Sequence, residues 1–207
     1  MKLYMSARAP NPRRVAMFAA EKGLQIPEQM IDIMSGEQRS DSYRAKNPLA
    51  RVPALELDDG RVLCETRAIC TYLEGLQPEP NLMGTDFEER AFIEMADRRM
   101  ELHLFAPVAN AARHTHPALA VLESPQIAEF GAVQSARVRE AVAWLDEVLA
   151  RQPYVAGGRF TIADITAFCA LEFAKGLIRF RPGQEGFAHV QAWRDRIAER
   201  PSAKAGN

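Results

Sequence analysis

The chain has 207 residues, which is enough for one or two domains and for a hydrophobic core that needs no disulfide or metal to hold it. Its 26 Lys and Arg residues nearly cancel its 27 Asp and Glu residues, so the bulk charge does not indicate a nucleic-acid-binding protein. Three cysteines without CxxC spacing exclude a disulfide framework, a zinc ribbon and a thioredoxin-type dithiol.

The start of the chain shows no apolar segment of signal-peptide length. No apolar run approaches the roughly 18 residues that a membrane span needs. Hydrophobic residues at 47% and charged residues at 26% are typical of soluble globular proteins. We therefore expect a soluble, cytoplasmic protein that binds neither nucleic acid nor membranes.

The first 75 residues or so alternate short strand-like and helix-like runs. Asp58-Asp59-Gly60 is a hairpin signal between two of the strands, and Gly23 marks a helix end. The order β-α-β-α-β-β-α predicts an α/β layer domain. The expected strands cover residues 3–5, 29–33, 52–57 and 61–64, and the expected helices cover 13–23, 41–47 and 66–74.

A Pro- and Gly-rich segment, residues 77–85, predicts a linker. Beyond it the apolar residues recur at helical spacing, and no strand pattern is convincing. Helices are expected over residues 86–113, with a break or kink near Pro107, and over 126–151, 161–178 and 187–199. The sequence thus predicts an α/β domain over residues 1–76 and an all-helical domain over 86–207.

Three local segments carry possible chemistry. Ala9 to Val15 spans a strand-to-helix turn, which is either a plain helix start or an anion site at the helix N-terminus. Pro53 opens a strand, either as a trans edge residue or as a cis residue that leaves the backbone of Val52 available to a ligand. Glu65-Thr66 either caps a helix or binds the ammonium and carboxylate of an amino-acid head group.

Taken together and in order, these segments resemble the glutathione transferase family over nearly the whole chain. The resemblance implies a thioredoxin-like N-terminal domain followed by an all-α domain. It also implies that Thr161 and Asp164 form a capping box at a buried helix start. The matching segments are Lys2-Leu3-Tyr4, Asn47-Pro48, Arg51-Val52-Pro53-Ala54-Leu55, Glu65-Thr66, Tyr154-Val155-Ala156-Gly157 and Phe160-Thr161-Ile162-Ala163-Asp164-Ile165.

The resemblance assigns a glutathione site to the first domain. Pro53 looks like the family's cis-proline, and Val52 would pair through its backbone with the cysteinyl unit of glutathione. The γ-glutamyl head and the glycyl carboxylate would bind elsewhere on the domain. Glu65 and Thr66 match the positions that hold the head, while Gln38, Arg39 and Arg51 match those near the glycyl end.

The residue that activates the thiol departs from the usual pattern. Ala9 stands where many members have Ser, Pro10 falls at the usual Cys position, and Tyr4 reads as a core residue. Asn11 resembles a bacterial subfamily in which an asparagine faces the sulfur. Its amide can donate to a thiolate, so Asn11 is the catalytic candidate, with the helix amides as the alternative and Ser6 as a weaker one.

The resemblance implies an enzyme that joins the glutathione thiolate to an electrophilic small molecule. The alternatives are glutathione-dependent disulfide reduction and a non-catalytic binding module of the same fold. Glutathione is the expected cosubstrate, and no metal is expected. The resemblance also implies a homodimer in which the long helix from residue 86, including Met95 and Arg99, faces the partner. The resemblance loosely matches Phe105, Arg113 and His114 to the electrophile site. The three histidines His103, His114 and His116 do not have the spacing of metal ligands.

Overall fold

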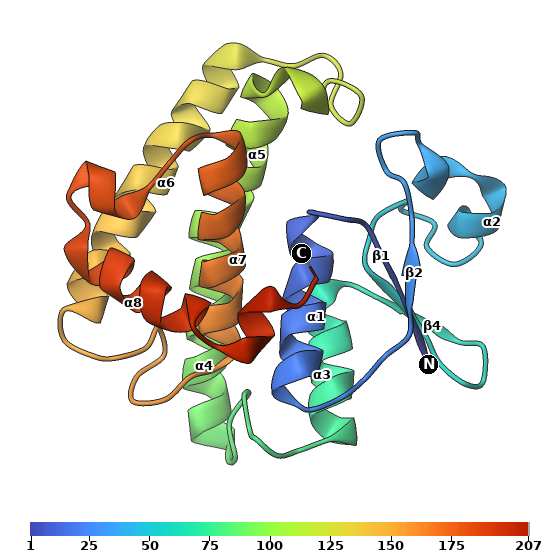
Figure 1. Ribbon diagram of the computed structural model, residues 1–207, viewed down its shortest axis with the longest axis horizontal. Coiled ribbons are helices and arrows are strands. Elements are labelled where there is room, and N and C mark those ends of the chain that lie inside the picture. Colours follow the sequence, from blue (N-terminus) through green and yellow to red (C-terminus); the bar gives the residue numbers. More distant parts are fainter. Residues whose placement is uncertain (207) are drawn as a thin grey trace. The chain divides into compact units, whose positions relative to one another are not determined.

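The structure is a computed structural model, and it describes residues 1–206. The chain forms two compact units, shown in Figure 1, and each is described by itself. The first unit contains Met1–Asn81 together with the terminal segment from Pro201, and the second contains Leu82–Arg200.

A four-stranded mixed sheet forms the centre of the first unit. The strands are β1 (Lys2–Met5), β2 (Glu28–Met30), β3 (Ala54–Glu56) and β4 (Val62–Cys64). Their order is β2-β1-β3-β4, with β1 and β2 parallel and the other two pairs antiparallel. The four strands expected from the sequence are therefore present, and together with the helices they confirm the thioredoxin-like α/β fold.

Helices cover both faces of this sheet (Figure 1). The helices α1 (Pro10–Glu21) and α3 (Thr66–Leu76) pack against one another. The short η1 (Glu37–Arg39) and α2 (Asp41–Arg44) lie on the other face, where Tyr43 of α2 meets Tyr4 of β1 edge-to-face with ring centroids 6.1 Å apart. Leu3 and Met5, the neighbours of Tyr4 in β1, are also buried. Because side chains alternate along a strand, they point to the opposite face, which α1 and α3 cover.

The terminal segment differs from the sequence expectation. Residues 86–207 were expected to belong together, but η5 (Pro201–Lys204) groups with the first unit. The guanidinium of Arg13 in α1 donates to the carbonyl of Ala203 at 2.8 Å, and Ser202 bonds to Glu21. Such a contact between residues about 190 apart in the sequence has no local signal, so pattern analysis could not find it.

The second unit is built from helices, as expected. They are α4 (Phe87–Arg99), η2 (Met100–Phe105), α5 (Ala106–Thr115), η3 (Pro117–Leu119), α6 (Ala128–Leu149), α7 (Ile162–Leu177), η4 (Pro182–Glu185) and α8 (Ala188–Ala198). Within residues 1–206, none of the helices combines the length and apolarity that crossing a bilayer would take.

The segments α4, η2 and α5 form one continuous helix, and η2 is a π-helical stretch within it. Pro107 follows directly in the first turn of α5 and has no N–H to donate to the carbonyl of His103. A π-helix forms i to i−5 hydrogen bonds instead, so the winding can change where the i to i−4 pattern is interrupted. The break expected near Pro107 is thus a change of helical winding rather than an end of the helix.

The start of α7 is fixed by a fully buried carboxylate, that of Asp164. It accepts the backbone N–H of Thr161 at 2.9 Å, the backbone N–H of Val155 at 3.0 Å and the indole N–H of Trp193 at 2.9 Å. The Thr161 side chain caps the helix in return, which confirms the predicted capping box. Burial raises the pKa of the Asp164 carboxyl to about 6, against these hydrogen bonds, which lower it.

Candidate active site

The pairing of the strands brings the predicted glutathione-binding segments of the first unit to one edge of the sheet. Tyr4 near the end of β1 is paired with Ala54 at the start of β3, and Ala54 is paired with Cys64 at the end of β4. The turn after β1, the Val52-Pro53 dipeptide before β3 and the Glu65-Thr66 dipeptide after β4 therefore lie at the same edge.

The first turn of α1 leaves few groups that could donate to an anion. Ala9 is the N-cap residue, no side chain caps the helix, and Pro10 is the first helical residue. Because Pro10 and Pro12 have no N–H, Asn11 is the one residue among the first three of the helix that has a backbone N–H. From the sequence, the backbone amides of this helix were the alternative to the Asn11 side chain as donors to the thiolate. Because of the two prolines, the backbone N–H of Asn11 is the main amide left for that role.

The side chain of Asn11 is held from within the helix. The guanidinium Nη1 of Arg14 donates to Asn11 Oδ1 at 3.1 Å, and Arg14 is only 1% exposed. No motif in the sequence marked Arg14 as a site residue. The available signal was its spacing, since residues three apart face each other on a helix.

The Val52–Pro53 peptide bond is cis, as predicted. Strand β3 begins only at Ala54, and within residues 1–206 the backbone of Val52 forms no hydrogen bond. The preceding carbonyl, that of Arg51, is held by the Tyr43 hydroxyl at 2.7 Å and by the Asn47 amide at 2.9 Å. The backbone N–H and C=O of half-buried Val52 are therefore available to pair with an extended ligand, and the segment that carries them is held in place.

Glu65 and Thr66 do not cap α3 in the way that the plainer interpretation of the sequence required. Glu65 is the N-cap residue, but no side chain caps the helix, and Thr66 is already inside it. Glu65 adopts φ 69°, a conformation that costs a non-glycine residue of order 1–3 kcal/mol. The exposed Glu65 carboxylate, the Thr66 hydroxyl and the first amides of α3 together match the ammonium and carboxylate of an amino-acid head group.

The remaining glutathione candidates lie on two loops. Gln38 of η1 is buried; its amide N–H donates to the carbonyl of Ile33 at 3.3 Å, while its Oε1 is buried without a partner among the described residues. Arg39 and Arg51 are exposed. An unpaired buried acceptor suits an N–H group of a ligand, whereas the two arginines suit a carboxylate.

Two other residues near this edge do not look like thiol activators. Tyr4 donates its hydroxyl to Glu56 at 2.5 Å, and burial together with this bond raises the pKa of Tyr4. Burial, together with the charge of Glu65, also raises the pKa of the Cys64 thiol. Tyr4 thus remains a core phenol, as the sequence suggested, and Cys64 remains a protonated thiol.

The residues matched loosely to an electrophile site lie in the second unit. Phe105 is buried. Arg113 pairs with Glu123 at 3.5 Å, and His114 accepts the backbone N–H of Ile127 on Nδ1 at 3.0 Å. That bond leaves the proton of the neutral imidazole on Nε2. Within residues 1–206 no group of three or more His, Cys, Asp or Glu side chains could hold a metal ion.

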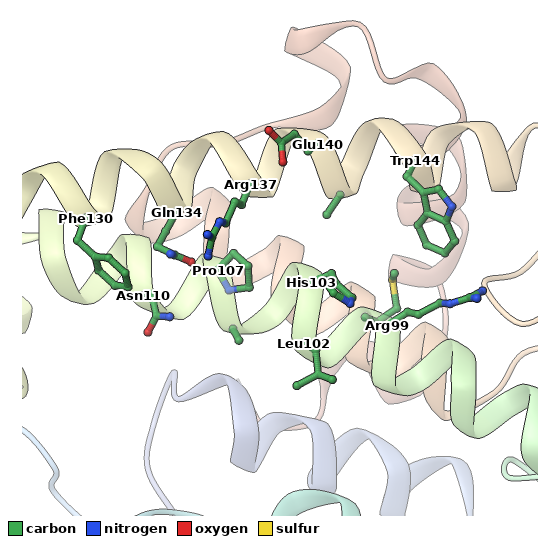
Figure 2. A pocket seen from close by; sticks show the side chains of 13 residues that line it. Arg99, Leu102, His103, Pro107, Asn110, Phe130, Gln134, Arg137, Glu140 and Trp144 are labelled. Carbon is green, nitrogen blue, oxygen red and sulfur yellow. The ribbon is translucent and has the colours of Figure 1, made fainter.

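The second unit also has an open groove of about 850 Å³ between η2–α5 and α6. Figure 2 shows side chains that line the groove, with Leu102, His103 and Asn110 on η2–α5 and Phe130, Arg137 and Trp144 on α6; Leu102 points away from α6. The guanidinium of Arg99 lies over the Trp144 ring, 5.8 Å from its centroid. Sequence analysis named Arg99 and His103 but not the groove, because it depends on the packing of two helices about 30 residues apart.

Comparison with known proteins agrees with both units. Residues 3–81 match the family model for the glutathione S-transferase N-terminal domain, and residues 110–201 match that for the C-terminal domain. Glutathione S-transferase 2 of Saccharomyces cerevisiae is 36% identical over 207 residues, which cover 99% of this chain and 88% of that protein.

Solved structures give the same result. The crystal structure of a glutathione S-transferase domain-containing protein from Marinobacter aquaeolei is 41% identical, has a TM-score of 0.93 and covers 98% of this chain and 99% of that one. Maleylacetoacetate isomerase of Pseudomonas aeruginosa is 40% identical, but over 93 residues, 44% of each chain. The chain therefore belongs to the glutathione S-transferase family, and it is an enzyme of that family.

Proposed function

We propose that this transferase conjugates glutathione to electrophilic small molecules and that Asn11 stabilises the reacting thiolate. The observation that carries the proposal is the first turn of α1, where the Asn11 amide stands between two prolines at the sheet edge. The likeness to the Marinobacter aquaeolei glutathione S-transferase domain-containing protein supports the glutathione-dependent part of the proposal.

In the proposed complex, each part of glutathione binds a different segment of the first unit. The first amides of α3 and Thr66 take the γ-glutamyl carboxylate, and Glu65 takes the ammonium. The backbone of Val52, next to Pro53, pairs with the cysteinyl unit. Arg39 and Arg51 face the glycyl carboxylate, and Gln38 accepts an N–H of the glycyl end.

The proposed reaction needs no general base with a matched pKa and no metal, because glutathione supplies the nucleophile. The thiol loses its proton to solvent, and the Asn11 amide donates to the resulting thiolate. The thiolate forms a C–S bond at the electrophilic carbon while the leaving group departs with the electron pair of the broken bond. Phe105, Arg113 and His114 are the residues that we propose to contact the electrophile.

A second activity is disulfide reduction, since a stabilised thiolate attacks sulfur as well as carbon. The test is retention on immobilised glutathione, followed by turnover of an aryl halide and of a small disulfide. Conjugation of the aryl halide with little disulfide turnover supports the proposal. Turnover of the disulfide alone would replace it, and failure to bind glutathione would contradict the assigned edge.

Thr66→Ala is expected to raise the KM for glutathione roughly tenfold or more while changing kcat little, because a hydrogen bond to a charged group is lost far from the sulfur. Steady-state kinetics with varied glutathione measure this. Thr71→Ala, one turn further along α3, is the matched control, since its hydroxyl bonds to the carbonyl of Arg67 at 2.9 Å. Equal KM values for wild type and Thr66→Ala would argue against the head-group assignment.

We also propose a homodimer that forms through the groove side of the second unit. Beside Met95 and Arg99, this side exposes several large apolar side chains, and exposed apolar patches of this kind mark interaction surfaces. They are Leu102, Phe130 and Trp144, which line the groove and whose exposed fractions lie between 39% and 54%. The two-fold symmetry common among homo-oligomers would place two such surfaces against each other.

Sedimentation at micromolar concentration should give a species of twice the 23.1 kDa chain mass. Leu102→Glu, which places a charge in the apolar surface, should shift the protein toward the monomer. Val121→Glu changes an equally exposed apolar residue outside the groove and should leave the dimer intact. A monomeric wild-type protein, or equal behaviour of the two variants, would refute this interface.

Two further parts of the proposal concern organisation and location. We propose that residues 77–85 link an N-terminal glutathione-binding domain, residues 1–76, to the helical domain that starts at residue 86. The family models, which match residues 3–81 and 110–201, support this division. We also propose a cytoplasmic location, which the small number of cysteines supports because a reducing compartment does not favour disulfides.

A further inference from the structure

We infer that Arg14 is a positioning residue for thiolate stabilisation: it holds the Asn11 amide so that its N–H₂ group faces the sulfur. The inference rests on the proposed role of Asn11. Its basis is the hydrogen bond from Arg14 Nη1 to Asn11 Oδ1, 3.1 Å long, inside the first turns of α1.

The chemistry of the two groups fixes the orientation of the amide. A guanidinium has donors and no acceptor, so the Asn11 atom that faces it is the carbonyl oxygen. The N–H₂ branch of the same amide then points away from Arg14. Without Arg14, a rotation of the terminal torsion of Asn11 would exchange the two branches, and an oxygen facing a thiolate would repel it.

The surroundings make this contact rigid. Arg14 is only 1% exposed, so its guanidinium does not move freely in solvent. Pro10 and Pro12 fix the backbone on both sides of Asn11, because a proline ring locks φ. Rigid placement of a donor before the charge develops is what makes electrostatic stabilisation effective.

Arg14 also brings a positive charge, which would favour a thiolate without any help from Asn11. The two modes of action give different results when both residues are changed. If Arg14 acts through Asn11, its removal has little further effect once Asn11 has become alanine. If Arg14 acts as an independent charge, the effects of the two substitutions add.

The test is ultraviolet titration of the thiolate of bound glutathione in wild type, Asn11→Ala, Arg14→Met and the double variant. We expect Arg14→Met to raise the thiol pKa by roughly one unit, as Asn11→Ala does, and the double variant to differ little from either. Arg13→Met is the matched control, because Arg13 is the neighbouring arginine and donates to Ala203 rather than to Asn11. It should leave the thiol pKa nearly unchanged.

Folding is checked by binding of S-methylglutathione, which has no thiol to ionise. If Arg14→Met fails to fold, Arg14→Gln takes its place in the same cycle, since glutamine carries no charge and, unlike a guanidinium, can present an acceptor as well as donors to the Asn11 amide. Additive pKa shifts, or no shift in Arg14→Met or its Arg14→Gln replacement, would overturn the inference and leave the role of Asn11 standing. An unchanged pKa in Asn11→Ala would instead refute the proposed role of Asn11, and the inference with it.

Discussion

Asn11→Ala is expected to lower turnover near neutral pH by up to roughly 10²-fold, which is the effect of removing one donor from a site of developing negative charge. The amide N–H₂ favours the charged form of the sulfur, so its loss raises the pKa of the bound thiol and reduces the fraction present as thiolate. The KM for glutathione should change little, since the proposed contacts with its head group and backbone are at Glu65, Thr66 and Val52.

The pH–rate profile of the same variant separates this effect from a general loss of activity. A raised thiol pKa moves the rising limb of the profile to higher pH, so turnover should recover as the pH increases. Asn11→Asp should be at least as impaired, because a carboxylate next to Arg14 accepts hydrogen bonds and adds negative charge beside the sulfur. A profile that falls uniformly at all pH values would speak against thiolate stabilisation.

Asp164→Ala is expected to destabilise the protein by at least roughly 3 kcal/mol, because it leaves three buried N–H donors without an acceptor. These are the backbone N–H groups of Thr161 and Val155 and the indole N–H of Trp193. The free energy of unfolding, measured by chemical denaturation at pH 7.5 where this carboxyl is ionised, gives the size of the effect.

The control for that prediction is a second helix cap, Asp86→Ala. Asp86 also accepts two backbone N–H groups, those of Glu88 and Glu89, each at 2.9 Å, but it is exposed at the start of α4. When an exposed cap is removed, water can bond to the freed N–H groups. The free energy of unfolding should therefore fall by only about 0.5–2 kcal/mol. Similar losses for the two variants would show that burial of the Asp164 bonds contributes little.

Much of the fold could be read from the sequence because its signals are local. Hairpin residues, glycine stops, prolines and the Thr161–Asp164 capping box each act within a few positions, and they marked the strands and helices to within a few residues. The π-helical η2 is a partial exception. Pro107 showed that the helix is disturbed there, but not that it continues.

The features that the sequence did not reveal depend on contacts between distant or differently wound segments. Attachment of η5 to α1 joins residues at opposite ends of the chain. The groove beside Trp144 needs two packed helices. Within the candidate site, short motifs indicated the segments proposed to bind glutathione. The hydrogen bond from Arg14 to Asn11 depends on side-chain direction, which the spacing of the two residues permits but does not determine.

The most direct test of the account is the pKa of the glutathione thiol in the bound complex, measured by ultraviolet titration of wild type, Asn11→Ala and Thr66→Ala. The account predicts a thiol pKa in the wild-type complex well below the usual value of about 8.5 for a cysteine. It predicts a clear rise toward that value in Asn11→Ala, with no comparable rise in Thr66→Ala. An unchanged thiol pKa in Asn11→Ala, together with unchanged turnover, would contradict it.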